Sequence, residues 1–117
     1  INIKLMNKNL KLVVNNVSFK GEEKFFFEKK ELKIILDLYA KMVSEGTWKD
    51  YGLNISNKKV SFSVFKNSAE NANYYISKNF RPKNKNLTYL ISDNRGRIIH
   101  NSSDLLNLIK NIDWKKL

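Results

Sequence analysis

The stretch from residue 29 to residue 45 constrains the fold most, because its apolar side chains recur with the period of an α-helix. From Leu32 onward they stand at i, i+3, i+4, i+7 and i+11, which places them on one face. Ile34, Leu38 and Met42 widen that face. The pattern predicts a helix that is covered on more than one side.

The ends of this helix are also marked in the sequence. Glu28 stands just ahead of the first turn, where a carboxylate interacts favourably with the helix dipole. Gly46 stands where a left-handed residue commonly ends a helix. The segment is therefore bounded on both sides.

Short extended runs follow the helix. Strands are predicted for "YGLNIS", "KVSFSVFK", "NYYISK", "LTYLIS" and "RIIH", with Asn57-Lys58 and "DNRGR" as turns between them. Two earlier runs, "NLKLVVNNVSF" at residues 9–19 and "EKFFFEK" at residues 23–29, also read as extended.

A second helix is predicted near the end of the chain. Ser102 or Ser103 with Asp104 would cap it, and its apolar stripe runs from Leu105 through Lys110 to Trp114. The fold class is therefore α+β: an antiparallel β-meander of about four to six strands with two α-helices packed on one face. Residues 1–117 form a single domain, with residues 1–8 frayed.

Composition limits where such a domain can work. The 117-residue chain has no cysteine, which excludes disulfides and thiolate metal sites and favours a cytoplasmic location. Its apolar runs are far shorter than the ~20 residues of a transmembrane segment. No transmembrane segment is therefore expected.

The net charge of +11 has two explanations. An excess of this size attracts nucleic acid or anionic surfaces. However, the chain has 19 Lys and 17 Asn but only 3 Arg, the bias that an AT-rich genome imposes on surface positions. Arg is the side chain favoured for bidentate phosphate and guanine contacts, so both explanations stay open.

Catalytic chemistry finds little support in the sequence. The single histidine, His100, has no cysteine with which to bind zinc, and the neighbouring Ser102, Ser103 and Asp104 are better explained as a helix cap. The four glycines match no phosphate-binding loop, and the acidic residues are scattered. We expect no enzyme, no metal and no cofactor.

Basic residues gather around one predicted loop. The run "SKNFRPKNK" joins two strands, and cations there could follow a phosphate backbone while an aromatic ring stacks on a base. The alternative is an ordinary solvated loop whose aromatic ring is folded back on the core, and the same residues would be found in such a loop. The candidate nucleic-acid residues, with the "DNRGR" turn added, are Lys78, Phe80, Arg81, Lys83, Lys85, Arg95 and Arg97.

The stretch "SEGTWKDYG" is the most distinctive corner of the predicted fold. Trp48 and Tyr51 are expected to cover the joint between the helix end and the first hairpin, and Asp50 to accept hydrogen bonds from turn amides or to pair with a lysine. The alternative is that these three residues form the lip of a ligand site.

Residues 27–78 resemble the core of a small alphaproteobacterial family known only as a domain of unknown function. That family has an F-x-R-x-E-L helix start, an I-L-x-L-Y-G-x-M-V centre, a G-x-W-R-D-Y exit and an F-S-V-F-R-R strand. The resemblance implies a small cytoplasmic domain with no assigned activity. The matching residues are Phe27, Glu31, Leu32, Ile35, Leu36, Leu38, Tyr39, Met42, Val43, Gly46, Trp48, Asp50, Tyr51, Phe62, Ser63, Val64 and Phe65.

Two classes of function follow. The first is binding of RNA or DNA through the basic loop, which is preferred because the charge is locally concentrated. The second is a protein-interaction or scaffold module, with Ile34, Leu38 and Met42 as an exposed strip that could join a protein partner or form a homodimer.

Overall fold

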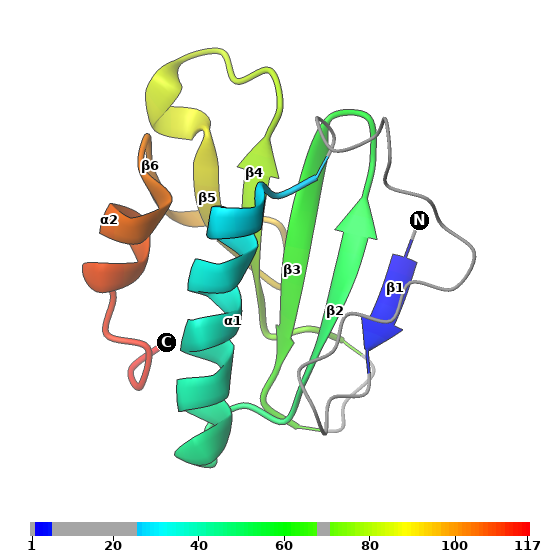
Figure 1. Ribbon diagram of the computed structural model, residues 1–117, viewed down its shortest axis with the longest axis vertical. Coiled ribbons are helices and arrows are strands. Elements are labelled where there is room, and N and C mark those ends of the chain that lie inside the picture. Colours follow the sequence, from blue (N-terminus) through cyan, green and yellow to red (C-terminus); the bar gives the residue numbers. More distant parts are fainter. Residues whose placement is uncertain (1, 6–25, 68–70) are drawn as a thin grey trace.

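The computed structural model describes residues 2–5, 26–67 and 71–117 and shows one antiparallel sheet covered on one face by two helices (Figure 1). Within these ranges the sheet has six strands in the order β1-β2-β3-β4-β5-β6, so each strand pairs with its neighbours in the chain. The helices α1 and α2 lie on the same face (Figure 1). The predicted α+β meander is therefore confirmed.

Five of the strands correspond to the five predicted after the first helix. Each pair is antiparallel, and the only break in register is a bulge in β6 opposite Ile91 and Ser92 of β5. The turn at the start of β6 contains Gly96 at φ +84°, a conformation that side chains with a Cβ rarely adopt. The strands are β2 (Asp50–Ile55), β3 (Lys59–Phe65), β4 (Tyr74–Asn79), β5 (Tyr89–Asp93) and β6 (Ile98–Ser102).

The predictions for the first part of the chain have a mixed outcome. The strand predicted at residues 9–19 lies outside the described residues. Within residues 1–8, predicted to be frayed, β1 (Asn2–Leu5) pairs with β2, because the edge of β2 offers backbone hydrogen-bonding groups to an extended segment. In the described part of residues 23–29, Phe26 and Phe27 are buried in the core and form no strand.

Helix α1 (Lys29–Ser44) begins and ends where the sequence predicts. At its start, Oε1 of Glu31 accepts a hydrogen bond of 2.6 Å from the backbone N–H of Glu28. At its end, Gly46 has φ +76°, and the N–H groups of Gly46 and Thr47 donate to the carbonyls of Val43 and Met42. This is the Schellman arrangement, which satisfies the last carbonyls of a helix.

Aromatic side chains form the centre of the core between α1 and the sheet. The ring of Tyr39 meets Tyr51 edge-on at 4.6 Å between centroids, and Tyr51 stacks on Phe62 at 4.8 Å. Trp48 contacts Trp114 at 5.6 Å. All five rings are at most 7% exposed, and rings at these distances add stability beyond the area that they bury.

A buried carboxylate also ties α1 to the sheet. Glu31 is 4% exposed, and its Oε1 accepts a hydrogen bond from Nζ of Lys78 on β4 at 2.7 Å. Its other oxygen accepts one from the hydroxyl of Tyr89 on β5. Burial alone would raise the pKa of Glu31, but the hydrogen bonds from Lys78, Tyr89 and Glu28, with the Lys78 charge, hold this pKa below its ordinary value of 4.5.

Helix α2 (Leu105–Lys110) is shorter than predicted. Its cap is Asp104, whose Oδ2 accepts a hydrogen bond from the N–H of Asn107. The helix ends before Trp114 because the chain turns back there and buries that indole, whose Nε1 donates to the carbonyl of Ile109 at 3.1 Å. The predicted extension to Trp114 is wrong for this reason.

The sheet face opposite the helices is lined by small hydroxyl side chains. Ser61, Ser63 and Ser77 are each at most 8% exposed, and the hydroxyls of Ser61 and Ser77 are 2.8 Å apart. They alternate with the core residues of β3 and β4, as the period of two in a strand requires. The two faces of β3 therefore differ in character: one is apolar and packs in the core, and the other carries hydroxyl groups.

Replacing Glu31 by Gln should remove a pH-dependent part of the stability. Because the folded-state pKa of Glu31 is lowered, its contribution is complete above pH 4.5 and is lost as the pH falls through the folded-state value. Gln cannot titrate and leaves Lys78 without its counter-charge, so we expect a loss of about 3 kcal/mol at neutral pH. Urea unfolding at several pH values measures both effects.

The matched control is Glu45→Gln, which removes an exposed carboxylate after the last turn of α1. We expect it to change the unfolding free energy by less than about 0.5 kcal/mol and to keep the acid-side slope of the wild type. Identical pH profiles for wild type and Glu31→Gln would contradict the role given to Glu31.

Replacing Gly46 by Ala should lower the unfolding free energy by about 1 kcal/mol, because φ +76° is unfavourable for a residue with a Cβ. A Cβ built there meets nothing within 4 Å, so crowding plays no part. Gly46→Asn should cost less, since Asn tolerates this conformation better. Equal losses for the two variants in thermal unfolding would contradict the backbone explanation.

Candidate nucleic-acid interface

The loop between β4 and β5 and the turn between β2 and β3 lie together at one end of the sheet. Lys59 is opposite Asn79 in the β3–β4 register, and the N–H of Phe80 donates to the carbonyl of Lys58 at 3.0 Å. This bond brings Lys58 beside Arg81 and the residues that follow. Sequence reasoning missed Lys58, although the hairpin register of β3 and β4 would have pointed to it.

Side-chain hydrogen bonds hold the β4–β5 loop in a defined shape. Nδ2 of Asn79 donates to the carbonyl of Leu87 at 2.7 Å, and Nδ2 of Asn101 on β6 donates to that of Asn86 at 2.7 Å. Both accepting residues belong to the short 3-10 helix η2 (Lys85–Leu87), whose first turn is capped by the side chain of Asn84. The basic side chains are therefore carried on a loop with local order.

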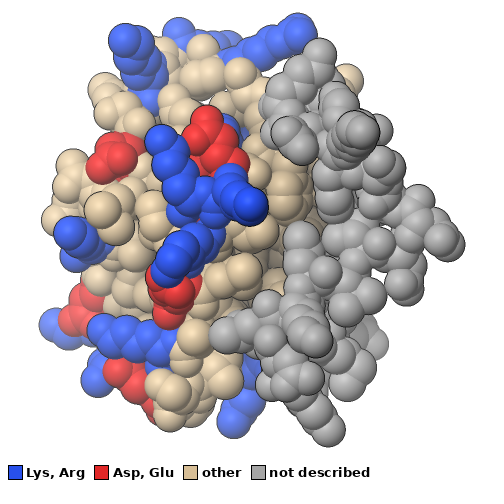
Figure 2. Space-filling model, viewed as in Figure 1, with Lys and Arg blue, Asp and Glu red and all other residues tan. Residues whose placement is uncertain are grey.

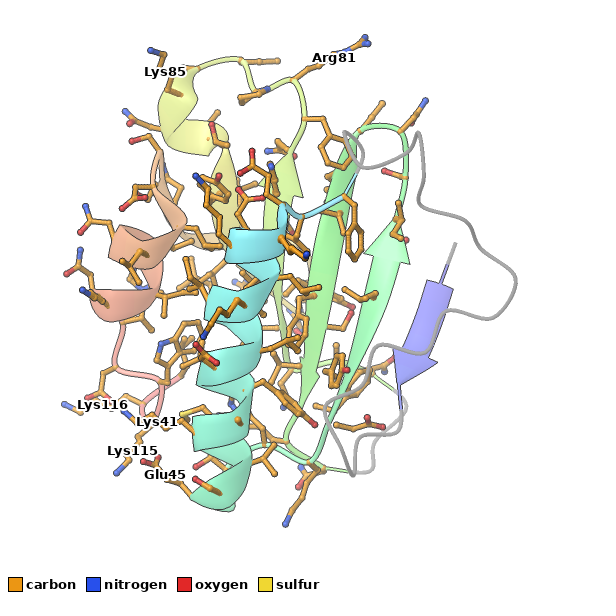
Figure 3. All side chains as sticks on the ribbon, viewed as in Figure 1. Lys41, Glu45, Arg81, Lys85, Lys115 and Lys116 are labelled. Carbon is orange, nitrogen blue, oxygen red and sulfur yellow. The ribbon has the colours of Figure 1, made fainter. Side chains whose placement is uncertain are left out.

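Among the described residues, the β2–β3 turn and the β4–β5 loop carry exposed cations at this end of the sheet, which we call the cationic end: Lys58, Arg81, Lys83 and Lys85. Figure 3 shows Arg81 and Lys85 pointing outward from the loop. Within residues 26–67 and 71–117, none of the four forms an ion pair. Residues 51–67 and 71–92 contain no acidic side chain that could neutralise them.

Five other basic residues in the described part of the chain pair with acids: Lys30, Lys33, Lys78, Arg97 and Lys116. Lys33 pairs with Asp37 at 2.8 Å on the outer side of α1. In Figure 2, Lys and Arg on the helix-bearing face are interleaved with Asp and Glu, whereas the charged side chains along the upper edge are Lys and Arg. The charge is thus uneven over this face of the molecule.

A hollow of about 540 Å³ opens within the cationic end. The β2–β3 turn forms one wall and the β4–β5 loop forms the other. Three of the four cations line it, and none of the lining residues is acidic. The lining residues are Asn57, Lys58, Asn79, Arg81, Pro82, Lys83 and Leu87.

Lys78 does not belong to this surface. Its side chain is 16% exposed and its Nζ lies 2.7 Å from Oε1 of Glu31, beneath the start of α1. The alternation of β4 turns Lys78 toward the helices, because it shares a face with Ile76 in the core. Its charge is already compensated inside the fold.

Phe80 is only partly exposed and packs against the hydrophobic core. It therefore does not stand clear of the loop as an aromatic platform. Its position agrees with the alternative stated in the sequence analysis, in which the ring folds back on the core, and not with a ring exposed for base stacking.

Arg95 and Arg97 lie in the β5–β6 turn, at the opposite end of β5 from the cationic end. Nε of Arg97 is 2.7 Å from Oδ2 of Asp93. The backbone N–H of Arg97 and its side chain, with the N–H of Arg95, hold the pKa of Asp93 below its usual value. These two arginines do not join the other candidate residues.

The "SEGTWKDYG" corner is structural. Trp48 and Tyr51 are at most 1% exposed, and Oδ1 of Asp50 accepts a hydrogen bond from the N–H of Tyr51 at 2.8 Å. Burial, followed by the neighbouring Tyr39 and Asp50, raises the pKa of Tyr51 to about 12. Buried rings of this kind form a joint, and they offer no open lip to a ligand.

The apolar strip predicted for self-association is not exposed. Leu38 and Met42 are 9% and 2% exposed, and Ile34 packs against the core. Exposed apolar side chains occur elsewhere among the described residues, notably Ile98 and Ile99 on β6. The broad apolar face of α1 is explained by its packing in the hydrophobic core.

Two further features bear on the class of protein. No group of three or more His, Cys, Asp or Glu side chains gathers as a metal site within the described ranges. In those same ranges, neither helix combines the length and apolar character needed to cross a membrane.

A comparison with known families bears on identity. The family model for a "Protein of unknown function (DUF2794)" matches residues 25–109, which include α1 and β2 through β6. The chain belongs to the DUF2794 family. No curated protein and no solved structure matches it. Most residues that carry the resemblance stated above are buried here, so membership of DUF2794 describes the core and leaves the cationic end unassigned.

Asn79→Ala should loosen the β4–β5 loop without unfolding the domain, because it removes the hydrogen bond to the Leu87 carbonyl at the base of the loop. We expect amide exchange at Arg81 and at residues 83–88 to become about tenfold faster, while the β3 amides keep their protection. Asn94→Ala, at the opposite end of the sheet, is the control. Unchanged exchange in the loop would show that this bond does not set its shape.

Proposed function

We propose that this member of DUF2794 is a small cytoplasmic binding domain, without enzymatic activity, that binds RNA or DNA through the cationic end. The observation that carries the proposal is the set of four exposed cations on an ordered loop and turn, none of which forms an ion pair with an acid among the described residues. Elsewhere, Lys33, Lys78 and Arg97 are paired with acids.

Phosphate groups are the natural partners of such a surface. Each phosphate neutralised by Lys or Arg releases counterions from the nucleic acid, which makes binding favourable and strongly salt-dependent. Three of the four cations stand within five residues of one another, from Arg81 to Lys85. Their spacing along the loop suits contacts with successive phosphates of one strand.

The excess of lysine over arginine bears on specificity. Lys acts on phosphate as a point charge, whereas Arg forms the bidentate contacts that read phosphate and guanine geometry. Arg81 is the only arginine of the cationic end. We therefore infer that phosphate contacts supply most of the affinity.

A protein partner is the second candidate. The observation that favours it is the exposure of single apolar side chains along the edge of the sheet: Ile98 and Ile99 on β6 and Leu106 on α2 are 54%, 40% and 41% exposed. Ile98 lies on the face opposite the helices, where it lines a hollow with Ser61 and Ser77, so the three side chains do not form one patch. Exposed apolar side chains on neighbouring elements are common at protein interfaces. The bulge in β6 argues against simple strand addition, since bulges blunt sheet edges.

Replacing Arg81, Lys83 and Lys85 together by Gln should weaken binding of a labelled single strand at low salt by about tenfold to a hundredfold. The slope of log Kd against log salt should fall by about 2, because three phosphate contacts at ~0.7 each are lost. Fluorescence anisotropy over a salt series measures both quantities.

The matched control replaces Lys41, Lys49 and Lys110 by Gln, which removes the same charge from exposed positions outside the loop. It should keep most of the affinity and the slope. If both triple variants lost the same affinity for the strand, the attraction would come from the net charge of the whole domain and not from a site at the cationic end. A wild type that binds no nucleic acid at low salt would refute the proposal.

A further inference from the structure

The hollow at the cationic end is larger than a phosphate requires. Its volume of about 540 Å³ falls within the range of about 300–1,000 Å³ for pockets that hold small organic groups. A phosphate on Lys58, Arg81 or Lys83 would leave most of this space unfilled. The hollow therefore has room for a larger group beside the phosphate.

Two carboxamides give the hollow hydrogen-bonding groups. The side chain of Asn57 makes no hydrogen bond to the described residues, so it offers both a donor and an acceptor. Asn79 uses its Nδ2 on the Leu87 carbonyl, and its Oδ1 has no partner in the described part of the chain. Carboxamides match the donor and acceptor edges of nucleobases.

The same hollow has apolar lining. Pro82 and Leu87 are both partly exposed, and the guanidinium of Arg81 can stack on a flat ring. A nucleobase has apolar faces and a polar edge. Its faces could pack against Pro82, Leu87 and the Arg81 guanidinium, and its edge could hydrogen-bond with the two carboxamides. A carboxylate or phosphate by itself would use the cations and leave the carboxamides and the apolar lining without a partner.

We propose that the hollow binds one unpaired nucleobase of a single strand whose flanking phosphates lie on Lys58, Arg81 and Lys83. This inference rests on the proposed function and adds a ligand class, single-stranded RNA or DNA. In a duplex every base is paired and stacked, so a base must first be extruded before it can enter a pocket. The domain therefore prefers single strands.

The test compares three labelled ligands by anisotropy at one salt concentration: a single strand, the same strand annealed to its complement, and an abasic strand of equal length. Wild type should bind the single strand about tenfold more tightly than either of the others, since base contacts add to phosphate contacts. RNA and DNA versions of the strand identify the preferred sugar.

Asn57→Ala is the variant that isolates the pocket. It should bring the affinities for the base-containing and abasic strands to within about twofold of each other, while the salt slope stays unchanged. Asn94→Ala, an exposed Asn in the β5–β6 turn, is the matched control and should keep the wild-type preference. In NMR spectra, the side-chain amide of Asn57 should shift with the single strand and not with the abasic strand.

The outcomes separate the two proposals. If wild type binds all three ligands equally with a steep salt slope, the base pocket is wrong and nucleic-acid binding stands. If wild type binds none of them, both are wrong. If an acidic peptide binds the cationic end and no nucleic acid does, the partner is a protein and both proposals are again overturned.

Discussion

The carboxylate of Glu31 joins three elements that are distant in sequence. It accepts hydrogen bonds from the N–H of Glu28, the ammonium of Lys78 and the hydroxyl of Tyr89, and so fixes the start of α1 over β4 and β5. Removing a buried carboxylate of this kind leaves a buried ammonium uncompensated, which is far more costly than losing a surface pair. The contacts of the Tyr39 ring with Tyr51 and Phe62 depend on α1 keeping this position along the strands.

This arrangement separates the parts of the chain that build the fold from the part that remains open to a partner. The rings of Tyr39, Tyr51 and Phe62 form the centre of the core, and the residues that carry the family resemblance are mostly buried around them. The cationic end lies before Val60, the first core residue of β3, and after Ile76, the last core residue of β4. Its side chains can change there at little cost to stability, because exposed charges contribute little to folding.

Much of the fold was predictable because periodicity reports burial directly. The helix at residues 29–44 and the five strands after it followed from apolar spacing, and Gly46 marked the helix end. The second helix was predicted too long, since the pattern cannot distinguish a helical Trp114 from one buried after a turn. In the candidate site, Arg81, Lys83 and Lys85 were predicted, whereas Lys58 was missed because it comes from a different hairpin.

The sequence by itself determined the fold class, the limits of α1 and a basic loop between two strands, because these depend on local spacing and composition. Only the tertiary structure decided which cations can reach a partner. Lys78 and Lys83 stand in the same basic run, yet one is held by Glu31 inside the fold and the other is exposed. Their difference comes from pairing across the sheet and the helix packed on it, which no local pattern encodes.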